Sequence, residues 1–274
     1  MFATRGIDYS YRVFDKARSE LVAALASDAL LRRFNELAYG ASEAYRADTN
    51  QFRTYLFPWE ERVVADFFPP APARILVGGA GGGREVFALA RMGYRVLAFE
   101  PSASLVATLA ATTPEGCDVE PHRAGYEDLL QPLGGQSGPL ATRLQELAPF
   151  DASIIGWGSF SHLMRDEERV GTLSFFRAVT KGPIIVSFLM LRTPGADAGG
   201  KLAALRSRLP RRPERSTDDL FSPYIGYYHS VDQQEVERLA SAAGLTVAYL
   251  NFDERETNWP HAVLSAAEAD VSTG

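Results

Sequence analysis

Glycines and one acidic residue are the parts of this sequence whose type and spacing could do chemistry. Residues 78–83, within the stretch ILVGGAGGGREVFALA, hold five glycines between an apolar run and a run with helical spacing. A glycine-rich turn before a helix lets a ligand approach the backbone, and the free amides of the helix start bind polar or anionic groups. Glu100 ends the next apolar run, where a carboxylate can accept hydrogen bonds from both hydroxyls of a ribose. The simpler interpretations are that the glycine turn only packs against a sheet and that Glu100 is an exposed carboxylate at a strand end.

The glycine turn and Glu100 must each follow a strand, and the surrounding pattern predicts such strands. Apolar runs at 74–78, 95–99, 117–121, 151–156 and 183–190 predict strands, and 83–92, 102–111 and 165–180 have helical spacing. One more helix, a glycine stop and a strand are expected after residue 231. Strands and helices in this alternation predict an α/β fold, a parallel sheet with helices on both faces.

The N-terminal part of the chain has a different pattern, which predicts helices only. Apolar residues recur at helical spacing over 19–38, and PWEERVVADFF predicts a second helix that ends at the prolines of 69–72. We therefore expect an N-terminal helical cap and substrate region at 1–69. The α/β domain follows at 70–274, with an insertion at about 192–228 where Gly, Pro and Arg are frequent.

Composition limits the class of protein and its surroundings. The 274 residues include 46% hydrophobic residues and carry a net charge of −6, which suits a globular protein and disfavours nucleic acid as a partner. Cys117 is the single cysteine, so an internal disulfide and a cysteine-based metal cluster are excluded. The histidines and carboxylates show no spacing typical of a metal site. We expect a cytoplasmic protein without membrane segments.

The glycine turn does not match the dinucleotide fingerprint, because Arg84 stands where its third glycine would be. Its spacing resembles motif I of class I S-adenosylmethionine-dependent methyltransferases, (D/E)-x-G-x-G-x-G. VLAFEPS is similar to that family's acidic strand end, AGYEDL to its adenine-binding loop, and FDASIIGWGSFSHL to its fourth-strand motif. The resemblance covers about residues 60–252 and implies a Rossmann-like, seven-stranded, mostly parallel sheet with an N-terminal helical extension.

The same resemblance implies S-adenosyl-L-methionine as the cofactor and S-adenosyl-L-homocysteine as the product. The residues that match the family's cofactor positions come from four segments. They are Gly79, Ala80, Gly81, Gly83, Glu100, Pro101, Tyr126, Glu127, Asp128, Gly156 and Trp157.

Two positions depart from the family pattern. Val77 stands where an acid usually helps to hold the methionine end of the cofactor, and Gly125 stands where many members have Asp. Arg84, Glu85 or Asp128 could bind the cofactor in place of these two missing acids. The turn GGAGGGRE also looks like that of spermidine synthases, but GWGSF lacks the acidic run that would hold an amine, so an aminopropyltransferase is disfavoured.

A methyltransferase must align an acceptor with the methyl group and, where needed, remove a proton. His162, just after the fourth strand, and His229 are the candidate bases, since an imidazole titrates near neutrality. The alternatives are that His162 is a surface or helix-capping residue and that His229 is a packed loop residue. We expect aromatic residues on either side of the domain to shape the acceptor pocket, or else to be plain core. They are Tyr55, Trp59, Tyr224, Tyr227 and Tyr228.

The function expected from these residues is methyl transfer to an O or N atom of a small molecule. The alternative from another class is a non-catalytic or regulatory protein that binds S-adenosylmethionine, which the missing acid at Val77 favours. Less favoured are an aminopropyltransferase and an RNA methyltransferase, the latter because glycines and prolines interrupt the Arg-rich segment 192–215. The expected partner is a small-molecule acceptor, and formation of a homodimer is left open.

Overall fold

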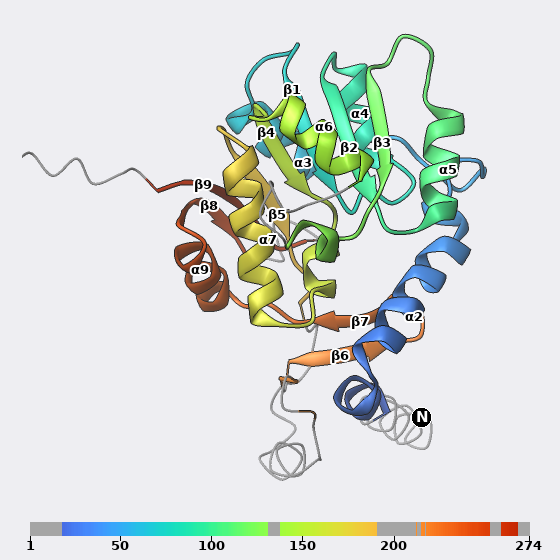
Figure 1. Cartoon of the computed structure of the whole chain (residues 1–274), viewed down its shortest axis with the longest axis vertical. Coiled ribbons are helices and arrows are strands. Elements are labelled where there is room, and N and C mark those ends of the chain that lie inside the picture. Colours follow the sequence, from blue (N-terminus) through green and yellow to red (C-terminus); the bar gives the residue numbers. More distant parts are fainter. Residues whose placement is uncertain are drawn as a thin grey trace, which may run out of the picture.

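A seven-stranded sheet forms the centre of the molecule (Figure 1). The computed structural model describes residues 18–130, 138–190, 212, 215–216, 218–252 and 259–267. The strands lie in the order β3-β2-β1-β4-β5-β9-β8. Their bounds are β1 (Arg74–Gly78), β2 (Arg95–Glu100), β3 (Val119–Arg123), β4 (Ala152–Ile155), β5 (Ile184–Ser187), β8 (Leu245–Asn251) and β9 (His261–Ala266). Strands β1 to β5 pair in parallel and β9 is antiparallel to β5 and β8, which confirms the predicted sheet.

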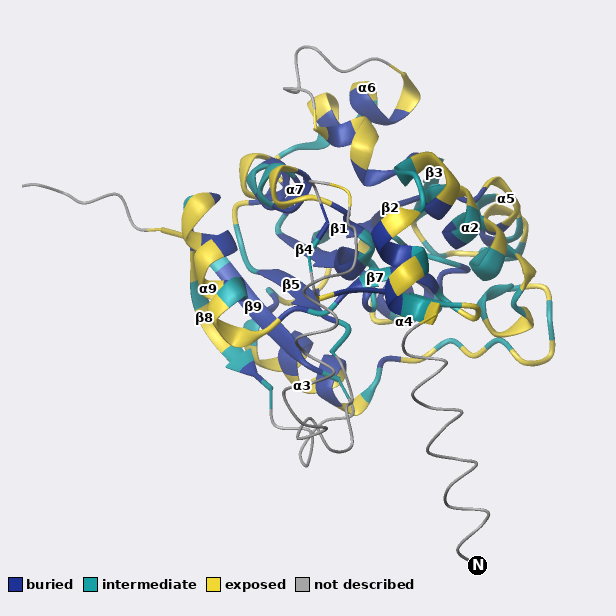
Figure 2. Cartoon of the chain, turned by 90° about the horizontal axis from the view of Figure 1, so that it is seen from below, coloured by how far each residue is buried: buried dark blue, intermediate teal, exposed yellow. Residues whose placement is uncertain are grey.

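Helices cover both faces of this sheet, because successive side chains of each strand point to opposite sides. Leu76 belongs to one core cluster, with residues of α6 (Pro139–Leu147), α7 (Asp166–Val179) and α9 (Gln233–Ala242). Ile75 and Val77 belong to the other, with residues of α3 (Pro58–Phe67), α4 (Arg84–Arg91) and α5 (Ala103–Thr112). Figure 2 shows the strands buried between these layers. Among the residues that the structure describes, no helix has both the length and the apolar character to cross a membrane.

Two elements of the structure were not expected from the sequence. Helix α6 was not predicted, and neither was the hairpin of β6 (Asp219–Ser222) and β7 (Gly226–His229) near the end of the expected insertion. Helix α3, in the region expected as a helical cap, packs its Trp59 and Val63 in the same cluster as Ile75 of β1. Most of the Arg-rich segment 192–215 lies outside the described residues.

Helix α2 (Asp28–Ala41) runs across the carboxyl ends of the strands, from beside the hairpin toward α5 (Figure 1). At its start Asp28 binds Arg165, 2.5 Å away, and at its end Gly40 lies beside Ser102 and Ser104. Between these points Asn35 pairs with the backbone of β7. Its Oδ1 accepts from the Tyr227 amide at 2.8 Å, and its Nδ2 donates to the Tyr227 carbonyl at 3.2 Å. Asn35 thus acts as a strand partner for β7 and fixes α2 over the sheet edge.

The contact between α2 and β7 can be tested at Gly226. A Cβ there would lie 1.9 Å from Asn35 Oδ1, whereas a Cβ at Gly116 meets nothing within 4 Å. Both glycines have a φ near +80°, so Ala strains the backbone equally at each. We expect Gly226→Ala to lower the free energy of unfolding by about 2 kcal/mol more than Gly116→Ala, because displacing Asn35 leaves buried polar groups unpaired. Urea unfolding of the two variants measures the difference, and equal losses would contradict the role of this contact.

Candidate functional site

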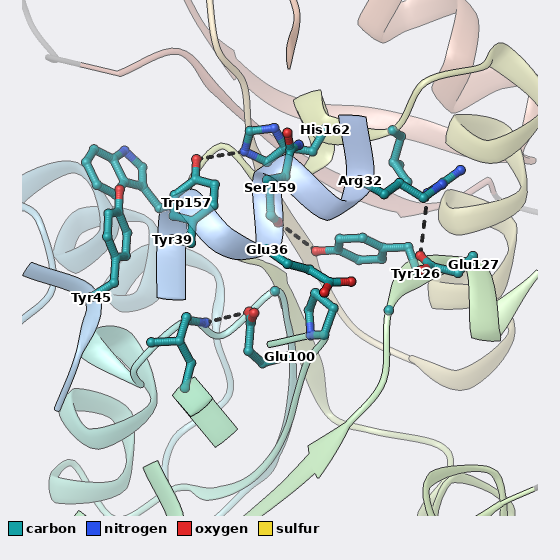
Figure 3. Close-up of a pocket in the computed structure, with 17 residues that line it drawn as sticks. Arg32, Glu36, Tyr39, Tyr45, Glu100, Tyr126, Glu127, Trp157, Ser159 and His162 are labelled. Carbon is teal, nitrogen blue, oxygen red and sulfur yellow. Dashed lines mark hydrogen bonds and ion pairs between the residues drawn. The ribbon is translucent and has the colours of Figure 1, made fainter. Parts of the chain in front are cut away.

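A cavity of about 130 Å³ lies under α2, at the carboxyl ends of β1, β2 and β4 (Figure 3). Most of the predicted cofactor residues line it, namely Gly79, Gly81, Glu100, Pro101, Tyr126, Glu127 and Trp157. A second cavity, of about 360 Å³, adjoins it and shares Tyr45, Gly79, Gly81 and Trp157 with it. The glycine turn therefore separates two compartments, which we call the first and second cavity.

The glycine turn requires glycine for its backbone conformation and for its close contacts. Gly79, Gly81 and Gly83 have φ values of +66°, +54° and +91°. A Cβ on Gly79 would lie 2.7 Å from the side chain of Ser159, and one on Gly82 only 1.9 Å from the Tyr45 carbonyl oxygen. The first contact brings the loop after β4 to the turn, and the second brings the segment after α2 to it. Gly83 is the N-cap residue of α4 and packs on Leu109 rather than lining a cavity.

Glu100 is buried at the end of β2 and faces the glycine turn. Its two carboxylate oxygens accept hydrogen bonds from the amides of Gly81 and Ser102, each at 3.0 Å. Burial raises the pKa of Glu100 to about 7, these two bonds oppose the rise, and the carboxylates of Glu85 and Glu36 add to it. Each oxygen keeps one further acceptor direction, so the carboxylate can still accept two hydroxyl groups.

The loop after β3 places its three predicted residues differently. The Tyr126 hydroxyl donates to Ser159 Oγ at 2.6 Å, because the Ser159 hydroxyl itself donates to the Gly156 carbonyl at 2.8 Å. Glu127 lies 3.6 Å from Arg32 at the rim of the first cavity. Asp128 accepts from the Gly125 amide at 2.8 Å and does not line the cavity. Asp128 therefore stabilises the loop rather than replacing the acid absent at Val77 or Gly125.

His162 lines the first cavity, where its surroundings make it a poor base near neutrality. Its Nδ1 donates to the Tyr227 carbonyl at 2.6 Å, so its Nε2 accepts from the Tyr39 hydroxyl at 2.7 Å (Figure 3). Burial lowers the pKa of His162 to about 4, although the bond to Tyr227 opposes this shift. The imidazole is thus neutral, with both nitrogens occupied, and it fixes the direction of the Tyr39 hydroxyl.

His229 does not reach either cavity, which corrects the second predicted base. Its Nδ1 lies 2.8 Å from Asp219 and its Nε2 lies 3.0 Å from Glu235, so the ring joins the hairpin to α9. Burial favours the neutral ring, but the two carboxylates outweigh it and raise the pKa of His229. These contacts stabilise the packing of the hairpin against α9. Within the described ranges, no three His, Cys, Asp or Glu side chains are grouped so that they could hold a metal ion.

The predicted aromatic residues are dispersed rather than gathered in one acceptor pocket. Tyr55 lines the second cavity, together with Ala80 and Trp157. Trp59 is buried and stacks on His261 with ring centroids 4.3 Å apart. Tyr227, in strand β7 of the hairpin, is fully buried. Tyr224 is 83% exposed, and Tyr228 lines neither cavity.

Gly156, one of the predicted cofactor residues, packs against the carbonyls of Gly78 and Gly79 and lines neither cavity.

The residues that sequence reasoning missed come mainly from one face of α2. Arg32, Asn35, Glu36 and Tyr39 all line the first cavity, and Tyr45 lies between the two cavities. Their spacing of three and four residues is helical, but most of them are polar, and so they resemble an ordinary solvated face. The close-up shows Glu36 beside Glu100, and Tyr39 between Trp157 and His162 (Figure 3).

The comparisons with known proteins bear on the fold. No protein-family model matches the sequence, and no curated protein matches it. Among solved structures, the CcbJ methyltransferase of Streptomyces caelestis has a TM-score of 0.51 at 18% identity over 75% of this chain and 87% of its own. A SAM-dependent methyltransferase of Methanosarcina mazei gives 0.52 at 15% identity, over 78% and 99%. CalS10, an amino pentose methyltransferase of Micromonospora echinaspora, gives 0.50 at 16%, over 76% and 88%. The chain therefore has the fold of class I S-adenosylmethionine-dependent methyltransferases.

The bond between Tyr39 and His162 can be measured by removing one hydroxyl. We expect Tyr39→Phe to lower the free energy of unfolding by about 1.5 kcal/mol, because Nε2 of the buried imidazole loses its donor. Tyr228→Phe is the matched control, since its hydroxyl has no hydrogen bond to any described residue. That control is expected to stay within about 0.5 kcal/mol of the parent chain. Urea unfolding compares the two variants, and equal losses would mean that Tyr39 does not donate to His162.

The raised pKa of His229 predicts a pH-dependent contribution to stability. Protonated His229 is favoured in the folded state, so its contribution is complete below the unfolded-state pKa of about 6.5. It is lost as the pH rises through the higher pKa of the folded state. We therefore expect His229→Gln to lower the free energy of unfolding at pH 5.5 and progressively less toward alkaline pH. Unfolding titrations across this range test it, and a loss that grows with pH would contradict the assignment.

Proposed function

We propose that this chain is an S-adenosylmethionine-dependent methyltransferase that acts on an O or N atom of a small-molecule acceptor. The observation that carries the proposal is the buried carboxylate of Glu100, which faces a left-handed glycine turn inside a covered cavity. The class I methyltransferase fold supports it. The proposal includes S-adenosylmethionine as cofactor and S-adenosylhomocysteine as product.

The residues of the first cavity fit the adenosine part of this cofactor. Glu100 has only amide donors at its oxygens, so ribose hydroxyls can add two further hydrogen bonds without adding charge. Leu105 and Pro101 supply apolar surface for the adenine, and the Tyr126 amide and the Glu127 carboxylate supply polar partners at its edge. The glycines of the turn have no side chains, so the part of the cofactor between the ribose and the sulfur can lie close to the backbone there.

In this proposal the bound cofactor supplies a methyl group on a sulfonium, and the chain orients the reactants and excludes water. Tyr45 and Trp157 lie where the two cavities meet, with stacked rings whose centroids are 6.4 Å apart. Aromatic faces attract cations, which favours a sulfonium at this junction. Neutral His162 directs the Tyr39 hydroxyl, and four side chains of α2 line one wall of the first cavity, which reduces the access of water. The chain thus contributes alignment rather than a strong base.

The proposed acceptor is a small molecule because α2 and the segment after it cover the site closely. The Tyr45 carbonyl lies against Gly82, and Asn35 binds β7, so little room is left for a polymer chain across the turn. CalS10 is described as an amino pentose methyltransferase of calicheamicin biosynthesis, and its fold resembles this one. An RNA methyltransferase has less support, since the first cavity is lined by three glutamates and one arginine.

The second candidate is a protein that binds the cofactor without transferring its methyl group. Two observations favour it: Val77 is buried in the apolar core, and His162 is a poor base. Incubation with labelled S-adenosylmethionine and a panel of phenols, amines and carboxylates separates the candidates. Transfer to any acceptor supports the enzyme, whereas tight cofactor binding with no transfer supports the binding protein.

Cofactor binding should depend on pH through Glu100. Above its pKa of about 7 the carboxylate accepts both ribose hydroxyls, and below it one oxygen carries a proton instead. We expect the Kd for S-adenosylhomocysteine to rise about tenfold from pH 8 to pH 6. Glu100→Ala should abolish binding, while Glu61→Gln, on the exposed face of α3, should leave it unchanged. Calorimetric titration measures both, and a folded parent chain that binds no adenosyl ligand would overturn the proposed function.

A further inference from the structure

The second cavity contains a carboxylate that the adenosine part of the cofactor does not use. Glu85, in the first turn of α4, lines this cavity with Gly79, Gly81 and Trp157, and its side chain is only 5% exposed. Burial raises the pKa of Glu85, Arg84 opposes the rise, and Glu60 adds to it. A buried carboxylate destabilises the folded protein unless a cation or several donors compensate its charge.

Arg84 compensates this charge only in part, because another acid holds its guanidinium by hydrogen bonds. Its Nη1 and Nη2 donate to the two oxygens of Glu60 at 2.6 and 2.7 Å, and Nη1 also donates to the Tyr55 carbonyl at 2.9 Å. The guanidinium also lies over the ring of Phe57, 4.0 Å from its centroid. Glu85 lies 3.7 Å from Nη2, which is too far for a hydrogen bond. The hydrogen-bonded pair is therefore Arg84 with Glu60, while Glu85 lines the second cavity beside them.

Glu85 also lies at the ends of β1 and β4, where β1 itself offers no acid. Its Oε1 would be 3.0 Å from a Cβ placed on Gly156, and that same Cβ would touch the carbonyl oxygens of Gly78 and Gly79. Val77, one residue before Gly78, is fully buried in the apolar cluster. Among the residues lining the second cavity, Glu85 is the one carboxylate.

We propose that Glu85 binds the ammonium group at the amino-acid end of the cofactor, in place of an acid on β1. The inference rests on the proposed function. If the ribose lies at Glu100, the rest of the molecule must cross Gly79 and Gly81 and enter the second cavity, which shares both glycines with the first. The amino-acid end carries an ammonium group there, and Glu85 is the buried anion that it meets.

The proposal is tested by changing the residue and the ligand together. The residue change is Glu85→Gln, which keeps the shape of the side chain and removes its charge. The ligand pair is S-adenosylhomocysteine and its deaminated analogue, which lacks only the ammonium group. Calorimetry gives the four affinities, and Glu61→Gln serves as the matched control on the exposed face of α3. Binding of 5′-methylthioadenosine, which has no amino-acid end, reports on the adenosine site alone.

We expect the parent chain to bind S-adenosylhomocysteine at least about tenfold more tightly than the deaminated analogue, as a partly buried charge pair requires. Glu85→Gln should remove this preference and leave the affinity for 5′-methylthioadenosine unchanged. A preference that persists in Glu85→Gln would overturn the inference, as would a parent chain that binds both ligands equally. If Glu85→Gln does not fold, Glu85→Asp replaces it, and its shorter carboxylate should weaken only the amino-containing ligand.

Failure of the proposed function gives a different result from failure of this inference. A folded parent chain that binds none of the three adenosyl ligands contradicts the proposed function itself. A parent chain that binds 5′-methylthioadenosine and S-adenosylhomocysteine, with an unchanged preference in Glu85→Gln, contradicts only the role of Glu85.

Discussion

The carbonyl oxygen of Tyr227 is the acceptor on which the arrangement of the site depends. It accepts from Asn35 Nδ2 on α2 and from His162 Nδ1 in the loop after β4, and so joins three segments far apart in the sequence. The first bond holds α2 over the sheet edge. The second leaves His162 Nε2 as an acceptor, which in turn directs the Tyr39 hydroxyl. The position of α2 over the cavity and the orientation of the Tyr39 hydroxyl therefore both depend on this carbonyl oxygen.

Tyr227 can hold these three segments together because its side chain is also held in place by the surrounding residues. The hydroxyl donates to Asp219 at 2.7 Å, and Arg215 lies over the ring, 5.1 Å from its centroid. Asp219 is bound in turn by His229, which also contacts Glu235 on α9. The hairpin is thus a rigid support behind the cavity rather than a cover above it. This explains why its aromatic residues and His229 line neither cavity.

The sequence could predict the parts of the site that follow from local pattern. Gly79, Gly81 and Glu100 lie at the ends of neighbouring parallel strands, and the carboxyl ends of such strands meet at one edge of the sheet. Asn35 and Tyr39 could not be found in this way. Their partners lie 192 and 123 residues further along the chain, and no short-range pattern records such a pairing. The sequence also could not show that His162 is buried, and this burial is what lowers its pKa.

The charges around the glycine turn set a further condition on what can bind. Glu36, Glu85 and Glu100 lie close enough that the first two raise the pKa of the third, while Glu60 neutralises Arg84 and Arg32 is held by Glu168 and Glu127. Such a cavity favours a ligand that brings positive charge and hydroxyl donors over an anionic one. Under the proposed function, the cofactor carries a sulfonium before transfer and a neutral thioether afterwards. Loss of that charge beside the carboxylates and the ring of Trp157 would weaken the attraction, so under this proposal the acidic lining would promote release of the product.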